Sequence, residues 1–215
     1  QSVSYFAGIN LMTIKNRAEF VRRFTLTPSP SVDRKLDEPL RKRLRPAAVL
    51  IPIIERPHGL SLILTRRSAS LRKHAGQISF PGGRYDRTDR DLLDTALRET
   101  EEEIGLPRSQ VEVIGRLHDY PVLSYFMIRP YVAFVSPQQE LVAEESEVAE
   151  IFEVPLADIL DPSNHYVYRI RKFIYDRVYF IPWQHRNIWG ATAGILRELA
   201  EQLQPERKSH FKPLN

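Results

Sequence analysis

Short apolar stretches separated by turn-forming residues dominate the hydrophobic pattern of this chain. A nearly continuous apolar run covers residues 47–54, as is typical of a strand buried on both faces. His58 and Gly59 mark a turn after this run, and residues 60–65 are predicted to form its hairpin partner. The pattern predicts further strands at 111–118 and 130–136, an apolar stretch from 150 that ends near Pro162, and a pair of strands within 166–181.

Helical spacing of apolar residues occurs in two segments. One is the segment 190–202, and the other lies between Asp89 and Gly105. Asp89 is expected to cap the second helix, Asp91 to lie in its first turn, and Gly105 to end it. Its predicted buried face consists of Leu93, Ala96, Leu97, Thr100 and Ile104. Together with the strands, these helices predict a mixed α+β domain.

Three regions are expected along the chain. Residues 1–45 form an N-terminal extension with a short basic helix at 13–24, a linker containing Pro28 and Pro30, and a charged approach that ends in a basic run at 41–45. Residues 46–204 form the main domain, and residues 205–215 form a polar tail that is expected to fray. Met12 is a candidate natural start, so residues 1–11 are left out of the fold prediction.

Composition narrows the classes of function. With 215 residues, of which 42% are hydrophobic and 27% charged, the chain is expected to bury the core of one domain. The charge balance of 31 − 27 = +4 suits an anionic ligand but is too small to indicate a DNA-binding protein. The absence of cysteine excludes disulfides, thiolate metal sites and a cysteine nucleophile. No apolar run is long enough for a transmembrane helix and no secretory signal is recognised, so a cytoplasmic protein without membrane or nucleic-acid partners is expected.

An acidic cluster lies at the end of the predicted helix 89–105. Glu99, Glu102 and Glu103 are spaced i, i+3 and i+4, so their carboxylates are expected to form one patch beside the apolar face, whereas Glu101 points elsewhere. Like charges at this spacing cost roughly 0.2–0.5 kcal/mol per pair. Negative charge near a helix C-terminus costs about 0.3–1 kcal/mol per group. A divalent cation would offset both costs, and Mg²⁺ prefers carboxylate oxygens together with substrate phosphate.

The alternative reading of this cluster is an exposed acidic face with no ligand. The preceding segment, Phe80 to Gly83, favours the metal site, because glycine lets backbone groups approach a ligand or metal closely. A glycine loop directly before a helix that carries carboxylates suits a metal–phosphate site. An ordinary Pro-Gly turn would explain the glycines, but it would not explain why they come directly before a helix that carries the glutamates.

The segment from Gly83 to Leu106 resembles the signature of the Nudix hydrolases, usually written G-x5-E-x7-R-E-U-x-E-E-x-G-U with U apolar. The match from Arg98 onward fails only at Thr100, which replaces an apolar residue. Upstream, Asp89 replaces the first glutamate, and eight residues instead of seven separate it from Arg98. Residues 64–83 read L-T-x-R-S-x3-R-x3-G-x3-F-P-G-G, which resembles the signature of the coenzyme A pyrophosphatase branch of this family.

The resemblance implies a Nudix fold, a mixed β-sheet in an α/β/α sandwich. It also implies a metal-dependent diphosphatase that cleaves coenzyme A or its derivatives to 3′-phospho-AMP and 4′-phosphopantetheine. Metal-assisted phosphoryl transfer leaves the protein to supply positioning and charge. On that basis Mg²⁺ or Mn²⁺ is the expected cofactor, and the expected ligands are Glu99 and Glu103, with Glu102 as a third ligand or water bridge and the carbonyl of Gly82 as a further candidate. Among the expected catalytic residues, Glu102 and Glu103 carry the carboxylates, and Arg98 orients a glutamate as its counterpart does in the family.

The general base and the substrate contacts stay open. The base is either a glutamate of the box or one from the acidic loop Glu144, Glu145 and Glu147. Arg67 and Arg72 are candidate contacts to phosphate, and the backbone at Gly83 is a candidate contact to substrate. Aromatic residues within 166–180 and Trp183 could stack on adenine, although a core role is more common for such residues.

Three alternatives to the coenzyme A prediction follow. The enzyme could cleave another small nucleotide such as NADH, ADP-ribose or a nucleoside triphosphate. The domain could instead sense a nucleotide without turnover, although the intact glutamate set argues against this. A nucleic-acid-binding role would depend only on the basic run at 41–45 and the net charge. The sequence does not decide between a monomer and a homodimer.

Overall fold

The computed structural model describes residues 14–30, 38–71, 74–172, 175–207 and 212–213. A mixed sheet of eight strands forms its centre, with the order β3-β2-β1-β7-β5 and with β4, β6 and β8 paired to β1, β7 and β2. Only β1 and β7 run parallel, whereas the other pairs are antiparallel. The strands are β1 (Arg45–Arg56), β2 (Gly59–Arg67), β3 (Ile78–Ser79), β4 (Gly82–Arg84), β5 (Val111–Arg116), β6 (Tyr120–Val122), β7 (Phe126–Val135) and β8 (Val148–Pro155).

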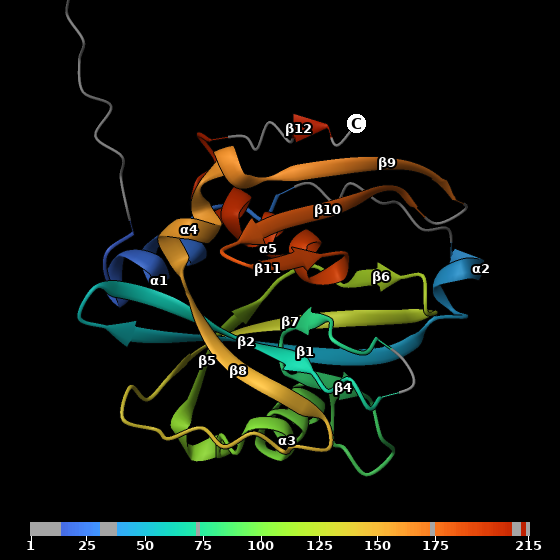
Figure 1. Cartoon of the computed structure of the whole chain (residues 1–215), viewed down its shortest axis with the longest axis horizontal. Coiled ribbons are helices and arrows are strands. Elements are labelled where there is room, and N and C mark those ends of the chain that lie inside the picture. Colours follow the sequence, from blue (N-terminus) through green and yellow to red (C-terminus); the bar gives the residue numbers. More distant parts are fainter. Residues whose placement is uncertain (1–13, 31–37, 72–73, 173–174, 208–211, 214–215) are drawn as a thin grey trace, which may run out of the picture.

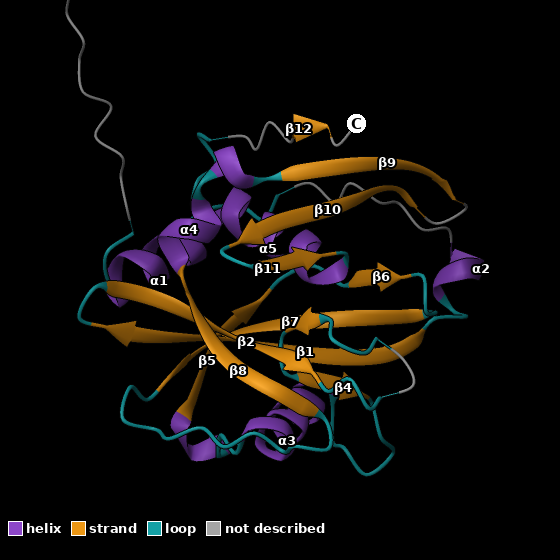
Figure 2. Cartoon of the chain, viewed as in Figure 1, coloured by secondary structure: helices purple, strands orange, loops and turns teal. Residues whose placement is uncertain are grey.

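Helices cover both faces of this sheet, as Figure 2 shows. Helix α3 (Leu92–Ile104) lies on one face against β1 and β4. The opposite face carries α1 (Arg17–Leu26), α5 (Ala191–Leu203) and a second, four-stranded sheet of order β11-β10-β9-β12. Its strands are β9 (Tyr166–Lys172), β10 (Tyr175–Trp183), β11 (Arg186–Trp189) and β12 (Lys212–Pro213), and the short helices are α2 (Glu38–Arg41) and α4 (Leu156–Leu160). The predicted mixed sheet between helices is confirmed, and the second sheet adds to it.

Burial on both faces explains the apolar run at the start of the domain. Along β1, Ile51 and Ile53 point into the large core between the sheet and α5, and Leu50 and Ile54 point into the smaller core under α3. The expected hairpin is confirmed, because β1 and β2 pair antiparallel and Arg56 is opposite Gly59. The smaller core thus packs β1 and β2 against α3, the helix that carries the acidic cluster.

The N-terminal helix belongs to the core of the domain. The helix predicted at 13–24 is observed as α1, and the side chain of Asn16 caps it by accepting from the Glu19 amide at 2.9 Å. Phe20 and Phe24 are buried in the large core, where Phe20 meets Phe134 edge to face. The expected extension 1–45 therefore supplies two core aromatic residues, although its sequence is strongly basic.

The end of the chain also differs from the prediction. The tail 205–215 was expected to fray, but Lys212 and Pro213 form β12, which pairs with β9 opposite Tyr166 and Val167. The pair of strands expected within 166–181 is confirmed as β9 and β10. None of the helices in the described part of the chain is long and apolar enough to cross a membrane.

Candidate active site

Helix α3 carries the acidic cluster, and local signals fix both of its ends. Gly105 ends the helix in the left-handed conformation, with φ of 65°, as expected. Asp91 is the N-cap and accepts from the Asp94 amide at 2.8 Å. The prediction that Asp89 caps the helix is therefore wrong. Asp89 lies in the preceding loop and its carboxylate is turned into the protein, because a stronger partner is available there.

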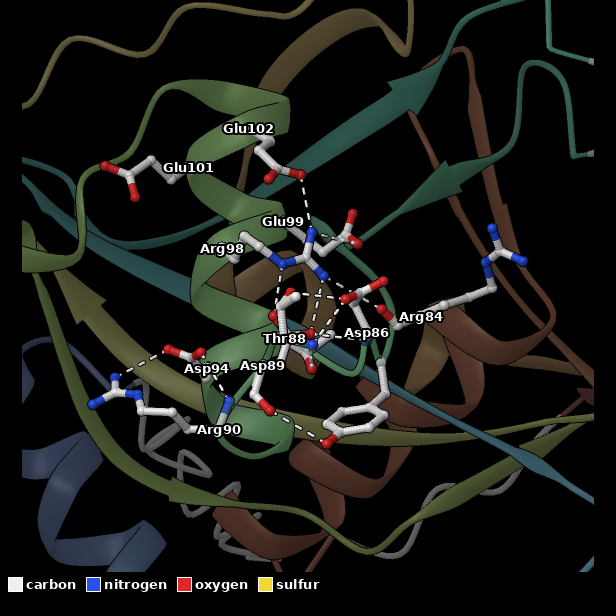
Figure 3. Close-up of polar contacts among 12 residues, drawn as sticks. Arg84, Asp86, Thr88, Asp89, Arg90, Asp94, Arg98, Glu99, Glu101 and Glu102 are labelled. Atoms are coloured by element: carbon white, nitrogen blue, oxygen red, sulfur yellow. Dashed lines mark hydrogen bonds and ion pairs between the residues drawn. The ribbon is translucent and has the colours of Figure 1, made fainter.

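That partner is Arg98. The Nε and Nη2 edge of its guanidinium pairs with the carboxylate of Asp89 (Figure 3). The Arg98 guanidinium donates to the two carboxylate oxygens of Asp89 at 2.7 and 3.0 Å. The Thr95 hydroxyl and the Asp86 amide also donate to Asp89, at 2.7 and 3.0 Å. The Asp89 side chain is only 1% exposed. Arg98 in particular holds the pKa of Asp89 well below its usual value, so the carboxylate is a fixed charge that positions the arginine.

The other side of Arg98 faces the acidic cluster. Its Nη1 lies 3.0 Å from a carboxylate oxygen of Glu99 and 3.0 Å from one of Glu102. Figure 3 shows Glu99 and Glu102 both linked to this one nitrogen of the guanidinium, and Glu101 pointing away from it, as expected. Arg98 therefore connects the buried carboxylate of Asp89 to two glutamates of the box.

The three glutamates of the expected patch differ strongly in environment. The side chain of Glu102 is 59% exposed, that of Glu99 is 19% exposed, and that of Glu103 is 4% exposed. Glu103 accepts from the Gly82 amide at 3.1 Å and lies 3.5 Å from Arg67. Burial is the main reason why the pKa of Glu103 is raised to about 7, and burial also raises the pKa of Glu99. Glu99 and Glu103 are thus carboxylates whose charge the protein compensates poorly.

The glycine loop lies directly against these two carboxylates. Gly82 has a φ of 149°, and a Cβ at this position would overlap the carbonyl oxygen of Ala48. A Cβ at Gly83 would overlap the carboxylate of Glu99. The absence of a side chain at both positions therefore permits the close approach of β4 to β1 and to Glu99 of α3. The sequence predicted instead a close approach of this backbone to a ligand or metal.

Replacing Gly83 by alanine tests this close approach. The added methyl group would push the Glu99 carboxylate aside, and because that carboxylate ends a flexible side chain, we expect at most a small loss of stability. If Glu99 is a metal ligand, as the sequence predicts, activity is expected to fall by about tenfold or more, since a small misplacement of such a group is costly. The measurement is a double-mutant cycle of hydrolysis rates for Gly83→Ala and Glu99→Ala. Full additivity of the two losses would contradict the proposed contact.

The loop before β8 carries a third carboxylate, that of Glu147, whose charge acts on Glu99 and Glu103. Backbone hydrogen bonds tie this loop to the end of α3, where the Val142 and Glu144 amides donate to the carbonyls of Ile104 and Glu103 at 3.0 and 2.9 Å. The carbonyl of Glu147 accepts from the Ser68 amide at 2.8 Å, next to Arg67. The charge of Glu147 contributes to the raised pKa of both Glu99 and Glu103. Of the three acidic residues in this loop, Glu147 is the one coupled to both.

The residues present fit a hard divalent cation by their donor chemistry, although they do not form a finished cage. The described residues contain no group of three His, Cys, Asp or Glu side chains arranged to hold a metal ion. Glu99 and Glu102 meet at Nη1 of Arg98, whereas Glu103 faces the Gly82 amide and Arg67 instead. Glu99 and Glu103 nevertheless supply carboxylate oxygens, and the raised pKa values of both groups indicate that added positive charge would be favourable there.

The remaining candidates have mixed outcomes. Arg67 lies beside Glu103 at the end of β2, whereas Arg72 lies outside the described residues. Trp183 is stacked on Phe152 at 6.1 Å, and its indole N–H donates to Asp158 at 2.8 Å. Trp183 thus has partners within the protein, and its stacking on adenine stays a prediction. The role of Asp89 was missed, and its signal was the alignment of Asp89 with the first acidic position of the box.

Comparisons with known proteins agree with this geometry. The family model of the NUDIX domain matches residues 44–175. The chain is 44% identical over 188 residues to "Uncharacterized Nudix hydrolase NudL" of Photorhabdus laumondii, covering 87% of this chain and 97% of that protein. It is 43% identical over 186 residues to the protein of the same name in Pectobacterium atrosepticum, covering 86% and 93%. A MutT/nudix family protein from Enterococcus faecalis shares the fold, with a TM-score of 0.52 and 15% identity over 90% of this chain and 71% of that chain.

Proposed function

Because the chain belongs to the Nudix family and is a hydrolase of diphosphate bonds, we propose that its substrate is coenzyme A or a derivative of coenzyme A. The products would be 3′-phospho-AMP and 4′-phosphopantetheine. The observation that carries the proposal is the position of the segment 64–83, which resembles the coenzyme A branch. It contributes Arg67 next to Glu103 and Gly83 next to Glu99. The residues typical of that branch thus lie beside the carboxylates of the box.

The proposed metal ligands are the carboxylates of Glu99 and Glu103, with the Gly82 carbonyl as a further candidate. When bound there, Mg²⁺ or Mn²⁺ supplies positive charge that neutralises the diphosphate oxygens and acidifies water. Glu102 is proposed as a bridge through water, because its side chain is exposed and is held by Arg98. Asp89 and Arg98 would keep Glu99 and Glu102 in a fixed orientation, which lowers the cost of ordering them during the reaction.

Arg67 and Glu147 are proposed to act on the substrate and on water. The side chain of Arg67 is 27% exposed, so its guanidinium can donate to phosphate oxygens while it remains beside Glu103. Glu147 is proposed as the general base that takes a proton from the attacking water. This choice is supported by its loop, which the end of α3 and Ser68 hold beside Glu99 and Glu103. Oxygen from water bonds to phosphorus, the phosphorus–oxygen bond of the diphosphate breaks, and the proton goes to the base.

The base assignment predicts a selective loss of turnover. Glu147→Gln keeps the shape of the side chain but removes its basic oxygen, so kcat is expected to fall by about 10²–10⁴-fold. Glu145→Gln, in the same loop and exposed, is the matched control and is expected to stay close to wild type. The measurement is steady-state hydrolysis of coenzyme A as a function of pH. Equal rates for Glu147→Gln and Glu145→Gln would exclude Glu147 as the base.

A substrate panel tests the proposed function itself. The protein is incubated with Mg²⁺ or Mn²⁺ and with coenzyme A, NADH, ADP-ribose or ATP, and the products are separated and quantified. Release of 4′-phosphopantetheine with the highest kcat/KM, and its loss on chelation of the metal, is the expected result. A higher kcat/KM for another nucleotide would replace coenzyme A as the substrate. Thermal stabilisation by nucleotide without any turnover would instead indicate a sensor.

A further inference from the structure

Two arginines that the proposed reaction does not use contact Asp119, and the charge of a third, Arg41, also acts on it. The guanidinium of Arg129 donates to both carboxylate oxygens of Asp119, each at 2.7 Å. Arg116 lies 3.6 Å from the same carboxylate. Burial acts to raise the pKa of Asp119, but Arg129, Arg116 and Arg41 together hold it below its usual value. One negative charge is therefore shared by three positive charges.

These arginines come from three separate parts of the chain. Arg41 lies in α2 and begins the basic run at 41–45, Arg116 ends β5, and Arg129 lies near the start of β7. Figure 1 shows α2 beside the end of the sheet at which β1 begins. The fork of Arg129 already satisfies both oxygens of Asp119. Arg41 is exposed and the side chain of Arg116 is 55% exposed, so both present donors to solvent.

The sheet register connects this cluster, Arg41, Arg116 and Arg129, to the candidate active site. Arg129 is opposite Ala48 on β1, and Ala48 is opposite Gly83 on β4. Directly paired residues project to the same face of a sheet, so Arg129 lies on the face that carries α3 and Glu99. With two strand spacings between them, the backbones at 129 and 83 are about 10 Å apart. This separation is comparable to the distance between the diphosphate and a further phosphate on the sugar of the same nucleotide.

We propose that Arg41, Arg116 and Arg129 bind a second phosphate of the substrate, a phosphate monoester that a sugar separates from the diphosphate. This inference rests on the proposed function. It makes the cluster a determinant of specificity for nucleoside diphosphate derivatives with an additional phosphate, such as the 3′-phosphate of coenzyme A. Guanidinium groups suit this role because their paired donors match phosphate oxygens. Asp119 is a positioning residue that holds Arg129 in place.

A comparison of two substrates tests the proposal. Coenzyme A and 3′-dephospho-coenzyme A are hydrolysed by wild type and by the double variant Arg41→Gln/Arg116→Gln, which leaves the Asp119–Arg129 pair intact. The KM for coenzyme A is expected to rise by about tenfold or more, as expected when charge-assisted hydrogen bonds are lost. The kcat for coenzyme A and both constants for the dephosphorylated substrate are expected to stay within about twofold of wild type. Arg43→Gln, an exposed arginine in the same basic run, is the matched control.

A binding measurement separates this inference from the proposed function. Isothermal titration with adenosine 3′,5′-bisphosphate and with adenosine 5′-monophosphate requires no turnover. Wild type is expected to bind the bisphosphate about tenfold more tightly, and the double variant is expected to lose that preference. Equal affinity of wild type for the two ligands, or equal KM changes for the two substrates, would overturn the inference. If wild type hydrolyses neither substrate, the proposed function fails, and the titration still decides the phosphate site.

Discussion

Replacement of Glu103 by glutamine is expected to remove hydrolysis almost completely without weakening the fold. Glu103 is the most deeply buried of the box glutamates, and burial raises its pKa to about 7. Glutamine has the same shape and no charge to bury, so the free energy of unfolding is expected to stay the same or to increase. The amide cannot supply a second anionic oxygen to a divalent cation, so kcat is expected to fall by about 10²–10³-fold or more.

The control for this prediction lies on the same helix. Glu101 is exposed, points away from Arg98 and lies 3.8 Å from Arg108 (Figure 3). Glu101→Gln removes the same charge from the same turn, so it is expected to keep the rate within about twofold of wild type. The measurements are coenzyme A hydrolysis with Mg²⁺ or Mn²⁺ and unfolding in urea. Full activity of Glu103→Gln would show that the carboxylate is not part of the catalytic machinery.

Replacement of Asp89 by asparagine is expected to reduce both stability and activity. Asp89 is almost completely buried and bonds to Arg98, Thr95 and the Asp86 amide. Loss of its charge leaves Arg98 without its main partner, and removing one member of a buried ion pair costs about 3 kcal/mol of stability. Because Arg98 also holds Glu99 and Glu102, the rate of hydrolysis is expected to fall by about tenfold or more.

The dependence on pH distinguishes this ion pair from a neutral packing effect. The folded-state pKa of Asp89 is lowered, so its contribution to stability is complete above the unfolded-state pKa, which is about 4. The contribution is lost as the pH falls below that value toward the folded-state pKa. Wild type and Asp89→Asn should therefore differ most in urea midpoint near pH 7 and least in strong acid. A constant difference at every pH would contradict this account.

Asp86→Asn is the matched control for Asp89. Asp86 is exposed, and its carboxylate bonds only to the amide and hydroxyl of Thr88 among the contacts described. Its backbone amide, which donates to Asp89, is unchanged by the substitution. The free energy of unfolding of Asp86→Asn, measured in urea, is expected to differ from that of wild type by no more than about 0.5 kcal/mol. A loss as large as that of Asp89→Asn would assign the effect to the loop and not to the ion pair.

The hydrophobic and turn pattern of the sequence was sufficient to predict the structure of segments whose packing partners are close in sequence. The apolar run of β1, its hairpin with β2 and the left-handed end of α3 at Gly105 all follow from periodicity and turn chemistry. In contrast, the cap of α3 was assigned to the wrong aspartate. Asp89 and Asp91 have the same side chain, and only the tertiary contact with Arg98 decides which of them faces the helix end.

Packing between segments that are far apart in the sequence could not be predicted from the hydrophobic pattern. Basic residues surround Phe20 and Phe24 in α1, and only the fold shows that both enter the core. Spacing correctly placed Glu99, Glu102 and Glu103 on adjacent positions, but it could not predict their burial. The amide of Gly82 and the loop of Glu147 come from distant segments, and they make Glu103 a buried group while Glu102 remains in solvent.

We propose that Glu99 and Glu103 together bind one divalent cation, and the rest of the proposed site depends on this. Electron paramagnetic resonance measures free and bound Mn²⁺ directly as the ion is titrated into wild type, into Glu99→Gln/Glu103→Gln and into the control Glu101→Gln. Wild type and Glu101→Gln should bind Mn²⁺ with the same affinity, and the double variant should bind it at least about tenfold more weakly. Equal Mn²⁺ affinity for the double variant and wild type would contradict the account.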